Sequence, residues 1–288
     1  MAKVDYKELK KGGFMKQVQK DTFSLRLRGV GGQVTAEQLK KITEVAEAYG
    51  QGYIHLTSRQ GIEIPFIKLE DIEAVKAELA KAGVQPGACG ARVRTITACQ
   101  GRGVCPDGLI DTTALAKEFD EKFFGKDLPH KFKLGITGCR NNCLKAEEND
   151  LGIKGGLKPE WHETKCNSCG LCEAICPTKA ITTQKDKQGI AFDEAACIYC
   201  GRCVKSCPAE AWTGESGFIV YFGGLFGNRI AIGDQLVPII FSKEQLHTVV
   251  ATVVEFFKQH GKQGERLRTT LDRVGRDNLE RVLKSTQP

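Results

Sequence analysis

The sequence predicts an α+β protein in which a small α+β unit precedes a larger mixed domain that carries a cysteine-rich insert. Strand and helix patterns alternate through the first 83 residues, as expected when helices cover one face of an antiparallel sheet. Twelve of the thirteen cysteines then occur in pairs or tight repeats between residues 99 and 207. We expect the small unit over residues 1–90, the larger domain over 91–159 and 214–288, and the insert over 160–213.

The composition describes a globular chain with neither a membrane span nor a nucleic-acid module. Hydrophobic residues make up 41% of the 288, and no run approaches the roughly 18 apolar residues that cross a bilayer. The formal charge of +7 is dispersed, so we expect no nucleic-acid partner, although an anionic ligand would use a cationic lining. The first residues lack the apolar core of a signal peptide. So many cysteines at metal-ligand spacings favour a reducing compartment, the cytoplasm.

The elements of the small unit follow from local patterns. A strand, a helix, a strand pair and a second helix are predicted in turn over residues 23–34, 35–50, 53–66 and 69–83. Thr35 and Gln38 have the spacing of a capping box, which starts the first helix. Glycines follow the apolar stripes of both helices and end them.

The larger domain is predicted to contain two further strands and several helices. Asp111 or Thr112 begins a helix that runs to Phe123, and Ser242 with Gln245 begins another that runs to His260. Strand patterns cover residues 128–139 and 217–233, and a helix is expected near the C-terminus. Lys131 and Lys133 share one face of the first of these strands, because side chains alternate with period two.

Four cysteines in this domain have the pattern of an iron–sulfur site. They form two pairs, Cys99 with Cys105 and Cys139 with Cys143. Two such pairs suit a [4Fe–4S] cube, in which each thiolate binds one iron. Spacing alone would support only a metal site.

The insert contains two copies of the pattern C-x2-C-x2-C-x3-C-P. In bacterial ferredoxins with this pattern, the fourth cysteine of each copy binds the other of two [4Fe–4S] clusters. One cluster is therefore predicted to be held by Cys166, Cys169, Cys172 and Cys207, and the other by Cys197, Cys200, Cys203 and Cys176. Zinc is the alternative, but eight cysteines with paired prolines favour the clusters. Cys89 is left over and is expected to be a plain buried thiol.

Together these motifs resemble those of the sulfite and nitrite reductases that couple sirohaem to a [4Fe–4S] cluster. The resemblance rests on T-G-C-x3-C-x6-D-L-G-I from residue 137, on LRLRGVGG and LTSRQ in the small unit, and on ARVRTITAC before the first cysteine pair. A ferredoxin segment inserted at this point is similar to the subunits of dissimilatory and anaerobic sulfite reductases. The resemblance implies a ferredoxin-like half-domain plus a sirohaem and [4Fe–4S] domain, with an inserted 2[4Fe–4S] ferredoxin domain and three clusters in all.

The resemblance also implies roles for individual residues. The oxygens of the substrate would be held by Arg28, Arg94, Lys131 and Lys133. Sirohaem would be contacted by Thr57, Arg59, Asn141, Cys143, Gly224 and Asn228, with Cys143 bridging the cluster to the sirohaem iron. The residue types suit these roles, because a guanidinium presents a fixed fork of donors to an oxyanion and a lysine can also pass protons.

The expected function is the six-electron reduction of sulfite to sulfide, with electrons relayed through the ferredoxin clusters. Nitrite reduction to ammonia is the alternative with the same chemistry, and an electron-transfer subunit with a vestigial sirohaem site is the alternative of another class. The sequence has no flavin or nicotinamide fingerprint, since GVGG at 29–32 lacks the required spacing. A separate ferredoxin or flavin/iron–sulfur subunit is therefore expected as donor. One copy of the half-repeat also suggests a homo-oligomer or a complex with a homologous subunit.

Overall fold

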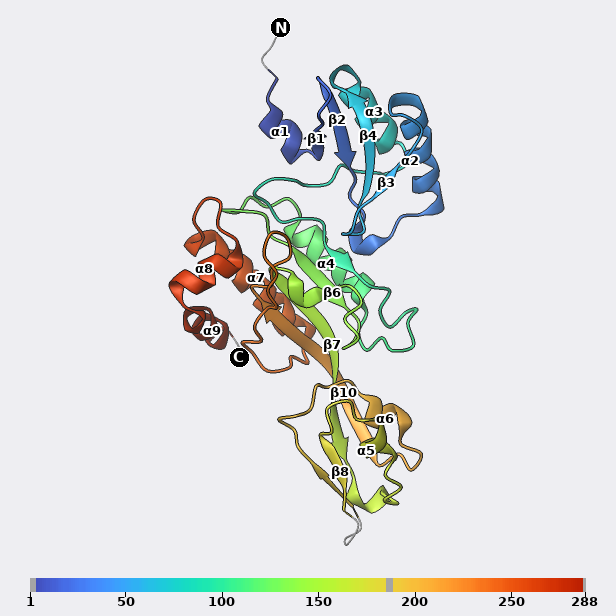
Figure 1. Cartoon of the computed structure of the whole chain (residues 1–288), viewed down its shortest axis with the longest axis vertical. Helices are drawn as coiled ribbons and strands as arrows, with labels where there is room; N and C mark the ends of the chain where they lie inside the picture. Colours follow the sequence, from blue (N-terminus) through green and yellow to red (C-terminus); the bar gives the residue numbers. More distant parts are fainter. Residues whose placement is uncertain (1–3, 185–188, 287–288) are drawn as a thin grey trace.

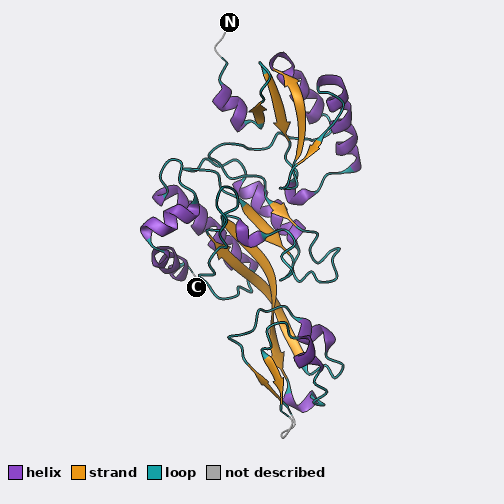
Figure 2. Ribbon diagram, viewed as in Figure 1, coloured by secondary structure: helices purple, strands orange, loops and turns teal. Residues whose placement is uncertain are grey.

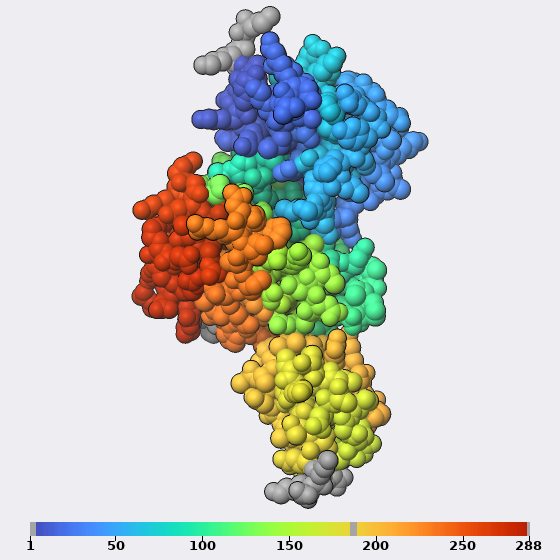
Figure 3. All heavy atoms as spheres, viewed as in Figure 1, coloured from blue at the N-terminus to red at the C-terminus, as the bar shows by residue number. Residues whose placement is uncertain are grey.

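The computed structural model describes residues 4–184 and 189–286. It is an elongated molecule of three lobes in a row, with the N-terminal lobe at one end and the insert at the other (Figure 1, Figure 3). The middle lobe combines residues from both sides of the insert. None of the described helices is long and apolar enough to cross a membrane.

The N-terminal lobe is a four-stranded antiparallel sheet, in the order β1-β2-β4-β3, with its helices packed on it (Figure 2). Its elements are α1 (Tyr6–Lys11), β1 (Phe14–Lys16), β2 (Thr22–Arg26), η1 (Val30–Gly32), α2 (Ala36–Tyr49), β3 (His55–Leu56), β4 (Ile62–Lys68), η2 (Leu69–Asp71) and α3 (Ile72–Ala80). The predicted capping box is present, because Thr35 Oγ1 accepts from Gln38 N and Gln38 Oε1 accepts from Thr35 N. The antiparallel sheet expected for this unit is confirmed.

The middle lobe has a mixed sheet in the order β10-β7-β6-β5, in which only β10 runs antiparallel to its neighbour. Its elements are β5 (Thr97–Ala98), α4 (Thr112–Phe123), β6 (Leu134–Thr137), η3 (Ala146–Glu148), β7 (Leu151–Trp161), β10 (Trp212–Phe222), α7 (Lys243–His260), α8 (Leu267–Val274) and α9 (Arg276–Ser285). One continuous apolar core joins the sheet to α4 and α7, with Phe119, Phe132 and Phe257 fully buried in it. Both predicted helix starts are correct, at Asp111 and at Ser242.

The long strands β7 and β10 pair over their whole length and carry the insert at their far end. Trp161 and Trp212 are direct partners in this ladder. Beyond them lie η4 (Glu163–Lys165), α5 (Leu171–Ile175), β8 (Ile181–Thr183), β9 (Ile190–Phe192) and α6 (Arg202–Ser206). Buried Trp212 meets Phe192 edge to face at 5.4 Å between ring centroids, which anchors the insert on the ladder.

Several strands are shorter than their sequence patterns predict. The pattern over 23–34 ends as a strand at Arg26, where the chain leaves the sheet and Leu27 bridges to Pro86. Of residues 128–139 only Leu134–Thr137 form a strand, and β10 stops at Phe222 rather than continuing to residue 233. Past these ends only isolated backbone contacts remain, such as Leu27 N donating to Ile62 O at 2.8 Å.

Candidate functional site

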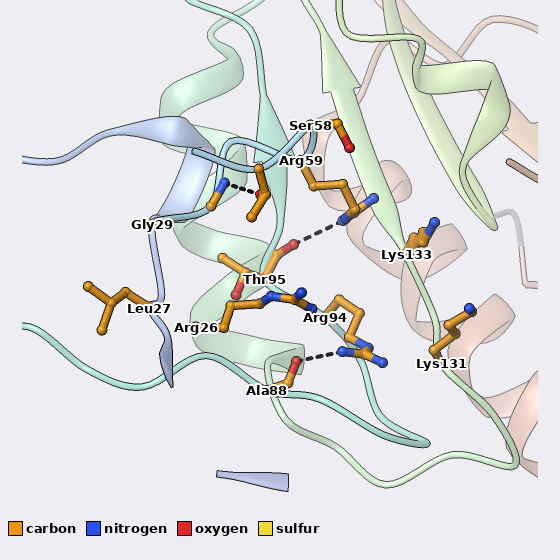
Figure 4. Close-up of a pocket in the computed structure, with 12 residues that line it drawn as sticks. Arg26, Leu27, Gly29, Ser58, Arg59, Ala88, Arg94, Thr95, Lys131 and Lys133 are labelled. Carbon is orange, nitrogen blue, oxygen red and sulfur yellow. Dashed lines mark hydrogen bonds between the residues drawn. The ribbon is translucent and has the colours of Figure 1, made fainter. Parts of the chain in front are cut away.

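A cationic cavity lies where the N-terminal lobe meets the middle lobe. It has a volume of about 280 Å³. Its polar wall includes the side chains of five cations: Arg26, Arg59, Arg94, Lys131 and Lys133. The arginines come from both lobes, and the two lysines lie just before β6, beside Arg59 and Arg94 (Figure 4). The structure therefore brings four of the predicted site residues to one cavity, together with predicted Thr57.

The charge of this cavity is largely uncompensated. Arg26 is paired with Glu63 at 2.5 Å. In the part of the chain that the structure describes, Arg59, Arg94, Lys131 and Lys133 have no carboxylate within ion-pair distance. Arg59 donates instead to Asn149 Oδ1 at 2.8 Å and to Thr95 O at 3.3 Å, and Arg94 donates to Ala88 O at 2.9 Å and Gly90 O at 3.0 Å. Such a wall favours an anion.

Burial and mutual repulsion act on the proton affinity of these cations. Burial, reinforced by Arg59 and Arg266, lowers the pKa of Lys133 to about 8. Burial also lowers the pKa of Arg59 to about 10 and lowers the pKa of Lys131 and of Arg94. Lys133 is thus a cation that can release a proton close to neutral pH, as a proton donor to a bound anion must.

Arg28 does not line this cavity, so its predicted role toward the substrate remains a prediction. Its Nε donates to Asp120 Oδ2 at 2.7 Å, and its guanidinium stacks on the Phe124 ring at 3.9 Å. Asp120 is only 1% exposed, so the pair holds α4 against the N-terminal lobe. Arg26, which the sequence analysis missed, lines the cavity instead. The available signal was its place two residues earlier in the same LRLR segment.

The loops that carry the first four cysteines lie together at the edge of the β5–β6–β7 sheet. The amide of Gly138 donates to Cys99 Sγ at 3.0 Å, which joins the two cysteine pairs. Burial raises the pKa of Cys139, and Asp107, Cys105 and Cys99 raise it further, so these thiols are within electrostatic range of one another. Cys143 is exposed. Gly155 of β7 packs so closely that a Cβ there would lie 2.2 Å from Gly138 O.

The eight cysteines of the insert form two separate groups. One cavity is lined by Cys166, Cys169, Cys172 and Cys207. A second cavity is lined by Cys176, Cys197, Cys200 and Cys203. The grouping is the crossed arrangement that the repeated motif predicts, with the fourth cysteine of each copy in the other group.

Backbone amides point at the sulfur atoms in the same way in both copies. The amide two residues after the first cysteine donates to its sulfur at 3.4 Å, in Ser168 to Cys166 and in Tyr199 to Cys197. The amide four residues after the last cysteine does the same, in Ala180 to Cys176 at 3.2 Å and in Ala211 to Cys207 at 3.3 Å. Amide donors favour the thiolate form that binds iron.

Each cysteine group of the insert has the four thiols that a [4Fe–4S] cluster binds. Among the described residues, no three His, Cys, Asp or Glu side chains converge as they would around one metal ion. In a cube each thiolate binds a different iron, so four cysteines around one cavity match its ligand set. The amide donors and the cysteine-lined cavities fit such a group.

Four residues predicted to contact sirohaem do not line the cationic cavity, namely exposed Cys143 together with Asn141, Gly224 and Asn228. Asn141 donates to Asp107 Oδ2 at 3.0 Å beside the cysteine loops. Gly224 packs against the backbone, since a Cβ would lie 2.0 Å from Glu147 O. Asn228 is exposed in the loop after β10. Phe226 of that loop accepts from Lys133 Nζ through its carbonyl at 3.4 Å, so the loop reaches the rim of the cavity.

Two family models match consecutive parts of the chain. The nitrite and sulphite reductase 4Fe-4S domain matches residues 89–287, and the nitrite/sulfite reductase ferredoxin-like half domain matches residues 15–82.

Individual proteins give the same relationship. A coenzyme F420-dependent sulfite reductase of Methanocaldococcus jannaschii is 36% identical over 92% of this chain and 42% of its own length. A subunit of the anaerobic sulfite reductase of Salmonella typhimurium is 34% identical over 59% of this chain and 54% of its own. The chain thus spans less than two thirds of these relatives. The crystal structure of dissimilatory sulfite reductase I has the same fold, with a TM-score of 0.74 at 22% identity over 91% of this chain and 69% of that one.

Proposed function

Because the chain belongs to the nitrite and sulphite reductase family, we propose that it reduces sulfite to sulfide with six electrons at a sirohaem–[4Fe–4S] centre. The observation that carries the proposal is the cavity of about 280 Å³. Four of its cationic side chains have no carboxylate partner in the described chain, namely Arg59, Arg94, Lys131 and Lys133. A protein that only relays electrons has no use for such a wall. The names of the sulfite reductases among its relatives support sulfite as substrate.

The protein groups would act on the oxygen atoms of the substrate. Sirohaem, when bound, would supply the redox-active iron at which sulfite is reduced, and Cys99, Cys105, Cys139 and Cys143 would hold the [4Fe–4S] cluster coupled to it. Arg59 and Thr57 would contact the carboxylates of sirohaem. Arg94 and Arg26 would hold sulfite oxygens, and their fixed positive charge stabilises negative charge as each S–O bond weakens. Lys131 and Lys133 would donate the protons with which oxygen leaves as water.

The insert would deliver the electrons. Its two cysteine groups would hold two [4Fe–4S] clusters, which supply one-electron chemistry. A contact joins this segment to the first cysteine pair, because Lys205 Nζ donates to Pro106 O at 2.9 Å, next to Cys105. We also propose an external ferredoxin or flavin/iron–sulfur donor, and an oligomer or a complex with a homologous subunit. A reducing, cytoplasmic location would keep these cysteines from forming disulfides.

Nitrite is the second candidate substrate. It also binds through its central atom and needs six electrons, and the matching family models name both reactions. The cationic wall suits either anion.

The visible spectrum of anaerobically purified, sirohaem-replete protein tests the proposal, with sulfite added to the reduced sample. We expect a sirohaem Soret band and red band that shift with sulfite. Iron–sulfur absorption alone, despite a supply of sirohaem, would reject the reductase and favour an electron-transfer subunit. Parallel additions of nitrite, with sulfide and ammonia measured as products, separate the two substrates.

A further inference from the structure

A buried ion pair lies behind the cationic cavity and joins distant parts of the chain. Asp150, the residue before β7, is fully buried. Arg266, the residue before α8, binds it with two hydrogen bonds, Nε to Oδ1 at 2.9 Å and Nη2 to Oδ2 at 2.7 Å. Asp150 Oδ2 also accepts the backbone amide of Lys133 at 2.8 Å. One carboxylate therefore holds both Arg266 and the backbone of a cavity lysine.

The charged groups around Lys133 come from every side of the cavity. Arg59, Arg266 and Lys131 oppose its positive charge, and Asp150 is the carboxylate that favours it. The same pair acts on Lys131 and on His130, where Arg266 opposes the cation and Asp150 favours it. Asp150 and Arg266 thus have opposite effects on the lysines that face the anion.

The arrangement has a consequence for where Lys133 points. A buried carboxylate without a partner attracts the nearest cation strongly, and Lys133 is bound to Asp150 through its own backbone amide. With both oxygens of Asp150 occupied by the guanidinium of Arg266, the ammonium group of Lys133 extends instead to Phe226 O at the cavity rim.

We propose that Asp150 and Arg266 form a positioning pair for Lys133, in which Asp150 fixes the lysine backbone and Arg266 keeps the lysine side chain from pairing with Asp150. Lys133 then remains available to an anion in the cavity. The inference deepens the proposed function and rests on it for the identity of that anion. Neither residue of the pair lines the cavity, so the pair acts through Lys133.

Lysine titration in the full-length protein tests the proposal without any turnover. Trace acetic anhydride labels amines competitively across neutral to alkaline pH, and mass spectrometry of the Lys133 peptide follows its titration. Arg266→Met removes the opposing charge, so Lys133 should titrate roughly one pH unit higher. Asp150→Asn removes the favouring charge and should lower the titration. Arg266→Lys keeps the charge and should stay close to the unsubstituted protein.

Arg276→Met is the matched control, because Arg276 also binds a carboxylate of the middle lobe, Asp234 Oδ2 at 2.6 Å, and neither residue lines the cavity. It should leave the Lys133 titration unchanged. The proposal would be overturned if the Lys133 titration shifted in the same direction in Arg266→Met and Asp150→Asn, or did not shift in either variant. A pair with a purely structural role would not shift this titration in opposite directions. If the shifts have the expected signs but the protein does not reduce sulfite, the positioning pair stands and the proposed function fails.

Discussion

At the scale of single residues, the cavity concentrates positive charge on groups of different chemistry. Arg59 and Arg94 are held by carbonyl and amide oxygens rather than by carboxylates, so their charge stays available to a ligand. Lys133 differs from them because its pKa is lowered to about 8, first by burial. The arginines can therefore provide a fixed charge while the lysine can change its charge near neutral pH.

Anion binding should consequently weaken as the pH rises through about 8. Below that pH Lys133 is protonated and attracts the anion, and above it the attraction is lost. A charged hydrogen bond contributes about 1.5–3 kcal/mol, so the affinity should fall roughly 10-fold to 100-fold. Binding of sulfate, whose charge is constant over this range, measured by calorimetry gives the answer. The fall should be absent in Lys133→Met; a fall of the same size in that variant would assign the effect to another group.

Substitution of Lys131 should impair activity, whereas substitution of Arg28 should impair the stability of the fold. Lys131→Ala should sharply lower sulfite turnover while all cofactors are retained, because Lys131 lines the cavity. Arg28→Ala should leave sulfate affinity unchanged but destabilise the fold by about 3–5 kcal/mol, since Asp120, 1% exposed, loses its ion-pair partner and keeps only the Ile96 amide as donor. Turnover, iron content and urea unfolding of both variants distinguish the roles. Normal turnover in Lys131→Ala would remove that lysine from the site.

At the scale of elements, glycines let β7 approach the loop that carries the second cysteine pair. Gly155 contacts Gly138, whose amide donates to Cys99 Sγ at 3.0 Å. The close approach connects the strand that carries the insert with the first cysteine site. A side chain at Gly155 would therefore push the strand and the loop apart.

Gly155→Ala should therefore lower the iron content of the protein. Its Cβ would lie 2.2 Å from Gly138 O, so the loop must move. This movement would displace Cys139 and Cys143 relative to Cys99 and Cys105. Gly103→Ala is the control in a neighbouring loop, because a Cβ there meets no atom within 4 Å. Iron analysis and electron paramagnetic resonance of both variants make the comparison. Equal iron content in the two would show that this contact does not support the cysteine site.

At the scale of the whole molecule, the insert is attached through one long strand pair. Because Trp161 and Trp212 are directly opposite each other, the chain enters and leaves the insert at one point. The contact between Lys205 and Pro106 is a second link, close to Cys105. The cationic cavity lies at the other end of the middle lobe, where the N-terminal lobe begins.

Replacing residues 162–211 with the dipeptide Asn-Gly should leave a folded protein. Asn-Gly forms a two-residue turn that can join the antiparallel strands β7 and β10. The shortened chain should bind sulfate with unchanged affinity, since no cavity residue lies in the insert. It should lose the iron of the two insert clusters and accept electrons from a protein donor far more slowly. Calorimetry, iron analysis and reduction kinetics check these outcomes. Undiminished reduction by a protein donor would place electron entry elsewhere.

Patterns that act over a few residues could be predicted from the sequence. The capping box of α2, the start of α7 at Ser242 and the antiparallel first sheet all follow from such patterns and are present. Family membership could also be predicted, because the cysteine spacings and their neighbours are local. The assignment of the insert cysteines to two clusters remains a prediction, although the structure places them in two matching groups.

Contacts between segments far apart in the chain could not be predicted from these patterns. Arg26 and Arg28 stand two residues apart in one segment, and only the departure of the chain from the sheet at Leu27 decides which one reaches the cavity. Likewise Arg266 meets Asp150 across 116 positions. The sequence by itself therefore determined the family, the capped helices α2, α4 and α7, and the residue types of the site. The tertiary structure decided which cations share a cavity and which are bound to buried carboxylates, because those partners come from strands and loops far apart in the chain.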